Sequence, residues 1–81
     1  MTALQKLALD ALDQLGSMTM HELEVACLIS AKQRGGFQAS IAPLFRRRLM
    51  LKRSGWVLVS GKGVQAIEDE NRKIDASEYA P

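Results

Sequence analysis

The chain has 81 residues, of which 47% are hydrophobic and 25% are charged, so it is expected to form one small folded domain with a modest core. Its single cysteine excludes an intramolecular disulfide, and a single histidine leaves too few ligands for a structural zinc ion. Charged residues interrupt the first apolar stretch, which therefore lacks the continuous run of a signal peptide or membrane span. These features predict a cytoplasmic protein without membrane contact.

The formal net charge of +2 conceals a strongly uneven distribution. Residues 32–62 contain eight Lys and Arg residues and no acid, whereas residues 1–31 and 63–81 each have a net charge of −3. An acid-free basic segment between acidic ends favours an anionic partner, and the alternative is a solvated surface of Lys and Arg.

The first helix is predicted to begin after Thr2, because Thr2 and Gln5 have the spacing of a capping box. Gly16 is expected to end this helix, because glycine readily adopts the left-handed conformation that follows many helices. Apolar residues at helical spacing predict one buried face. This face comprises Leu4, Leu7, Ala8, Ala11, Leu12 and Leu15.

A second helix is predicted from the capping box of Thr19 and Glu22. It is expected to continue through residues 26–29 and to end before the Gly35-Gly36 pair. Cys27 has apolar neighbours and is interpreted as a small core residue. His21 has no second ligand at metal-binding spacing, so no metal site is expected.

The third helix is predicted over residues 41–50, with Ser40 as its N-cap and Pro43 in its first turn. Helical periodicity turns Ile41, Leu44, Phe45 and Leu49 inward. Pro43, Arg46, Arg47 and Met50 then point outward. Arg48 falls on the inward side, so either the helix ends there or the side chain reaches over the edge of the core.

A β-hairpin is predicted next, with residues 51–53 and 56–59 joined by a tight turn at Ser54-Gly55. Alternation places Val57 and Val59 on one face of it. Ser60 is expected to cap a last helix. Residues 1–74 thus form a single domain, and residues 75–81 are expected to be a disordered tail.

This order of elements resembles that of the winged helix-turn-helix family. Residues 40–63 carry the resemblance: they look like a recognition helix, a basic wing around a glycine, and an exit segment Val59-Ser60-Gly61-Lys62-Gly63. The resemblance implies a mainly α fold, with a three-helix core, a small β-hairpin wing and a short C-terminal helix. The connection between the second and third helices is longer than in the simplest members. Arg48 stands where the family often has Gly or Asn.

The resemblance also implies a sequence-specific double-stranded DNA-binding protein that acts as a small transcriptional regulator. The third helix would enter the major groove, and the wing would contact the backbone. Arg46 and Arg47 are the base-reading candidates, because Arg suits bidentate contact with guanine. The implied DNA-binding residues are Lys32, Arg34, Gln38, Ser40, Arg46, Arg47, Lys52, Arg53 and Lys62.

An alternative is a winged-helix protein-interaction module, an adaptor or inhibitor that binds an acidic or nucleic-acid-binding surface. Trp56 and Leu58 would then be its contact residues, because they lie on the outer face of the predicted hairpin. The other interpretation is that Trp56 folds over the edge of the core. A homodimer is a further expectation, since sites for this fold usually have two half-sites. No catalytic set, cofactor or small-molecule ligand is expected.

Overall fold

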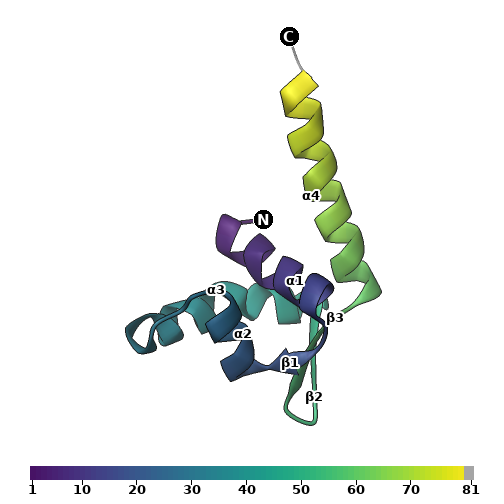
Figure 1. The fold of residues 1–81 in the computed structure, drawn as a ribbon. Coiled ribbons are helices and arrows are strands. Elements are labelled where there is room, and N and C mark those ends of the chain that lie inside the picture. Colours follow the sequence, from purple (N-terminus) through teal and green to yellow (C-terminus); the bar gives the residue numbers. More distant parts are fainter. Residues whose placement is uncertain (80–81) are drawn as a thin grey trace.

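A computed structural model describes residues 1–79 of the chain, with side chains to residue 73 (Figure 1). Its elements, in order, are α1 (Ala3–Leu15), β1 (Met18–Thr19), α2 (Met20–Ala26), the 3-10 turn η1 (Ala31–Gln33), α3 (Arg34–Arg46), β2 (Met50–Arg53), β3 (Trp56–Val59) and α4 (Gly61–Tyr79). The three strands form an antiparallel sheet in the order β1-β3-β2. The fold is therefore mainly helical with a small antiparallel sheet, and in this respect it agrees with the predicted fold class.

The core lies where α1, α2 and α3 meet one another and the sheet. Its largest fully buried side chains are Phe37, Leu9, Leu12, Leu23, Ile41, Leu44, Met50 and Val57. Burial of each large apolar side chain is worth roughly 1.5–3 kcal/mol, so this small set supplies most of the favourable free energy of folding.

The first helix begins and ends as predicted, but its buried face differs. Thr2 and Gln5 form the capping box, and Gly16 follows the helix with a φ of 90°. Leu7 and Leu15 are exposed, whereas Leu9 is completely buried. The reason is that α1 contacts α2, α3, α4 and β3, so that its buried surface is not the single stripe expected for a helix with neighbours on one side.

The predicted boundary between the second and third helices was wrong. α2 ends at Ala26, and α3 already begins at Arg34, so that Gly35 and Gly36 lie inside it. Glycine costs about 1 kcal/mol in a helix, but Phe37, Ile41 and Leu44 are buried along one face of α3. Their burial outweighs the propensity of the two glycines. Ser40 is consequently a mid-helix residue and not an N-cap.

The early end of α3 has an identifiable geometry. Arg48 has a φ of 59°, its N–H donates to the Phe45 carbonyl at 3.0 Å, and the Leu49 N–H donates to the Leu44 carbonyl at 2.9 Å. This is a Schellman motif, in which Arg48 occupies the left-handed position usually held by glycine. Of the two alternatives for Arg48, the helix therefore ends before it, and Met50 becomes the buried first residue of β2.

The hairpin is confirmed. β2 and β3 pair with Lys52 opposite Val57 and Arg53 opposite Trp56, and Ser54 and Gly55 both have positive φ, of 50° and 82°. Two positive values define the type I′ turn, whose twist matches that of the strands. The short strand β1, which the sequence did not predict, pairs with the other edge of β3.

The last helix is longer than expected. Ser60 caps it through its hydroxyl, which accepts from the Gly63 N–H at 3.0 Å, and Ile67 is buried. α4 continues to Tyr79 and projects away from the other elements (Figure 1), so residues 75–79 of the predicted tail are helical. The remainder of that tail, residues 80–81, lies outside the described residues. Within residues 1–79, no helix is long and apolar enough to cross a membrane.

Candidate nucleic-acid interface

The basic residues of the central segment form three groups along the fold. Lys32 lies in η1, and Arg34 is the first residue of α3. At the far end of that helix, about 20 Å away, Arg46, Arg47 and Arg48 precede β2, and Lys62 follows close by, because the Ser60 hydroxyl donates to the Arg48 carbonyl at 2.6 Å. The third group, Lys52 and Arg53, lies next to the hairpin turn.

These side chains are largely free of acidic partners. All eight basic residues between positions 32 and 62 are exposed. Arg34 forms an ion pair, and the other seven form none with the residues whose side chains are described. By contrast, Lys6, Arg72 and Lys73, outside this segment, each lie within 4.0 Å of a carboxylate. Lys and Arg side chains without an acidic partner among the residues whose side chains are described are thus confined to one stretch of the chain.

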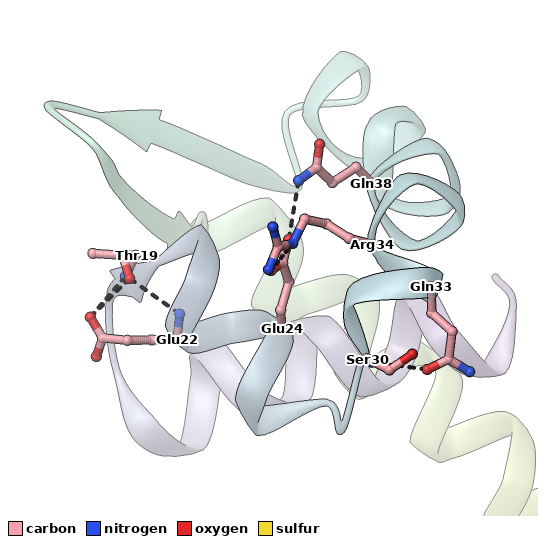
Figure 2. Close-up of polar contacts among 7 residues, drawn as sticks. All are labelled: Thr19, Glu22, Glu24, Ser30, Gln33, Arg34 and Gln38. Atoms are coloured by element: carbon pink, nitrogen blue, oxygen red, sulfur yellow. Dashed lines mark hydrogen bonds and ion pairs between the residues drawn. The ribbon is translucent and has the colours of Figure 1, made fainter.

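Arg34 and Gln38 share one partner, the carboxylate of Glu24 in α2 (Figure 2). The Arg34 Nε donates to Glu24 Oε2 at 3.0 Å, and the Gln38 Nε2 donates to Glu24 Oε1 at 3.1 Å. The side chain of Glu24 is only 5% exposed, whereas that of Arg34 is 51% exposed. We call these three residues the Glu24 cluster; it ties α2 to the first two turns of α3.

Glu24 was not singled out from the sequence, although a signal exists. Met20, Leu23, Glu24 and Cys27 have the spacing of one helix face, so a carboxylate occupies a core-facing position. Burying an unpaired carboxylate is costly, and such a residue predicts a buried basic or amide partner. The sequence does not say which, because Arg34 and Gln38 are brought to it only by the packing of α3.

The two base-reading candidates lie at the C-terminal end of α3. Arg46 is the last helical residue, and Arg47 is the C-cap. Arg47 also lines a hollow of about 220 Å³ together with Asp69 and Glu70 of α4. It therefore lies near acidic groups, although none is close enough for an ion pair.

The outward face of α3 carries small side chains before Arg46 is reached. Gly35, Gly36 and Ala39 are exposed, and Pro43 is partly exposed. Ser40 is half-buried, and its backbone carbonyl accepts from the Gln5 Nε2 at 2.9 Å, which joins α3 to α1. The helix can therefore approach a flat or convex partner closely, and its polar side chains are those of Arg34, Gln38, Ser40 and Arg46.

The wing presents an aromatic residue beside a cation. Trp56 is 49% exposed and lies directly opposite Arg53 on one side and Thr19 on the other. Leu58 is only partly buried and pairs with Leu51. Opposed residues in a sheet share a face, so Trp56, Arg53 and Leu58 lie together on its outer face.

Metal and thiol chemistry find no support in the described residues. They contain no group of three or more His, Cys, Asp or Glu side chains placed to hold a metal ion. Cys27 is buried, as predicted, and burial raises the pKa of its thiol, which makes it a poor nucleophile at neutral pH.

No family model, curated protein or solved structure matched the chain.

Proposed function

We propose that the protein binds double-stranded DNA as a winged helix-turn-helix module and acts as a small transcriptional regulator. The observation that carries the proposal is the set of seven exposed basic side chains without an acidic partner among the described residues. Unpaired cations are the groups that neutralise phosphates and release counterions. The order of three helices followed by a hairpin supports the same function.

The arrangement also supports a mode of binding. α3 would lie in the major groove with its N-terminal half, which carries Arg34 and Gln38, against the DNA. Lys52 and Arg53 would contact the backbone from the hairpin, and Lys32 would contact it from the other end of α3. Two such modules on adjacent half-sites would give a homodimer on DNA.

The test is to titrate a short fluorescent duplex of random sequence with the protein at NaCl concentrations between about 50 and 200 mM. Fluorescence anisotropy measures the binding affinity at each concentration. We expect the affinity to fall steeply with salt. The double substitution Lys52→Ala and Arg53→Ala should make the slope of log K against log salt shallower by about 2, because each lost phosphate contact removes about 0.9.

A matched control removes two positive charges elsewhere. Arg72→Ala with Lys73→Ala deletes cations that are paired with Asp69 and Glu70 on α4, and we expect this variant to keep the wild-type slope. Absence of binding at the lowest salt, or an equal change in both double variants, would contradict the proposal.

A second function is favoured by Trp56, which is half-exposed on the outer sheet face beside Leu58. A protein-interaction module would use these side chains as anchors on an acidic partner surface. Trp56→Ala distinguishes the two: capture of a partner protein that is lost on this substitution, in a protein that never binds duplex DNA, would support the interaction module.

A further inference from the structure

The Glu24 cluster fixes two polar side chains at the start of the helix proposed to enter the DNA groove, and the inference drawn from it rests on that proposed function. Both oxygens of the buried Glu24 carboxylate are occupied, one by Arg34 and one by Gln38 (Figure 2). A side chain held by a hydrogen bond loses little further rotamer entropy on binding. Arg34 and Gln38 are therefore preorganised, whereas the exposed Arg46 has no such partner among the described residues.

Arg34 keeps its most useful donors. A guanidinium has five N–H groups, and the Glu24 cluster uses the one on Nε. The N–H groups on the two terminal nitrogens form no hydrogen bond with any residue whose side chain is described, and half of the side chain is exposed. A free pair of terminal nitrogens matches the O6 and N7 acceptors that guanine presents in the major groove.

Gln38 has a fixed amide orientation. Because Glu24 only accepts hydrogen bonds when ionised, the Gln38 Nε2 must face it and Oε1 must face away. One Nε2 hydrogen is used, so the second hydrogen and Oε1 remain as an adjacent donor and acceptor. That pair matches N7 and N6 of adenine in the major groove.

The two residues are one helical turn apart on α3, a rise of about 6 Å along its axis. Successive base pairs are about 3.4 Å apart, so the two side chains reach neighbouring or next-neighbouring base pairs. We infer that Arg34 and Gln38 read a guanine and an adenine within two base pairs of each other, and that Glu24 is the positioning residue that holds both.

The experiment is selection of bound sequences from duplexes with a randomised centre, followed by affinity measurements on the selected site and on its single-base variants. We expect wild-type protein to select adjacent or nearly adjacent G and A. Replacing the guanine should weaken binding roughly 5- to 150-fold, the range of a bidentate contact. Arg34→Lys keeps the positive charge but lacks the fork, so it should abolish the guanine preference; Gln38→Ala should abolish the adenine preference.

Glu24→Gln tests the positioning role. This substitution should lower the guanine and the adenine preference together. Arg34→Lys should lower only the guanine preference, and Gln38→Ala only the adenine preference. Arg34→Lys keeps the test decisive if Glu24→Gln unfolds the protein, because Arg34 is exposed and its side chain is not part of the core. Arg72→Lys, the same change at an arginine paired on α4, is the control and should leave both preferences as in wild type.

The outcomes separate the two proposals. Wild-type protein that binds no duplex overturns the proposed function, and this inference with it. Salt-dependent binding without base preference, or a preference that Arg34→Lys and Gln38→Ala leave intact, overturns the inference alone.

Discussion

Two residues that directly follow the C-cap of a helix adopt a backbone conformation that their side chains disfavour. Leu28 and Arg48 both have a φ of 59°, and each follows a helix. The Leu28 N–H donates to the Val25 carbonyl and the Ile29 N–H to the Glu24 carbonyl, at 3.0 and 2.8 Å. The same Schellman pattern thus ends α2 and α3, in both cases without the glycine that usually permits it. Each of these residues stores about 1 kcal/mol of backbone strain.

Leu28→Gly should therefore stabilise the protein. The side chain is 89% exposed, so its loss removes no packing, and glycine adopts the left-handed conformation without a Cβ penalty. We expect the free energy of unfolding, measured in urea, to rise by about 1 kcal/mol. Leu28→Ala is the control: it also removes the exposed side chain but keeps the Cβ, and an equal gain from both would show that strain is not the cause.

At the scale of elements, one glycine sets how closely α4 approaches the sheet. A Cβ at Gly63 would collide with the carbonyl oxygen of Leu49 and would lie 2.7 Å from Cγ2 of Val59. The Leu49 carbonyl is fixed, because it accepts from the Ser60 N–H at 3.0 Å. Only a residue without a side chain allows the first turn of α4 to pack here.

Gly63→Ala is expected to destabilise the protein by about 1–3 kcal/mol, the usual cost of overpacking. Chemical unfolding followed by circular dichroism measures this. Gly61→Ala lies two residues earlier in the same helix, where a Cβ would meet nothing within 4 Å, and it should change the free energy of unfolding by less than about 0.5 kcal/mol. Equal effects would contradict the close-approach explanation.

Elements defined by local signals could be predicted from the sequence. The capping boxes at Thr2 and Thr19, and the turn at Ser54-Gly55, each depend on residues within a few positions of one another. The boundaries of α2 and α3 could not be predicted, because the burial of Phe37 against distant residues outweighs the local preference of Gly35 and Gly36. β1 escaped prediction for the same reason: two residues become a strand only because β3 lies beside them.

The candidate site likewise has a part that could be predicted from the sequence and a part that could not. The acid-free composition of the central segment predicted a concentration of basic side chains there, and all of them except Arg34, which pairs with Glu24, lack an ion-pair partner among the residues whose side chains are described. What holds Arg34 and Gln38 did not follow, since Glu24 lies 10 and 14 positions away from them. Arg46 and Arg47 were expected in the middle of a helix over residues 41–50, but α3 ends at Arg46, so both lie at its C-terminal end.

At the scale of the whole molecule, the unpaired cations should repel one another. Two unit charges about 10 Å apart in water interact by about 0.4 kcal/mol, and salt screens this. We therefore expect the free energy of unfolding to rise by about 1 kcal/mol when NaCl increases from about 50 to 500 mM. Lys52→Ala with Arg53→Ala should show a smaller rise. A fall in stability with salt would show instead that attractive ion pairs dominate.

The projection of α4 has an electrical consequence. The hairpin and the free end of α4 lie at opposite ends of the molecule (Figure 1), whose longest dimension is 44 Å. Residues 63–81 contain five acidic and two basic residues, whereas Lys52 and Arg53 lie beside the hairpin turn. Such a charge separation is a permanent electric dipole along the long axis. In the field of a polyanion such a dipole would experience a torque that turns the hairpin toward the polyanion before contact.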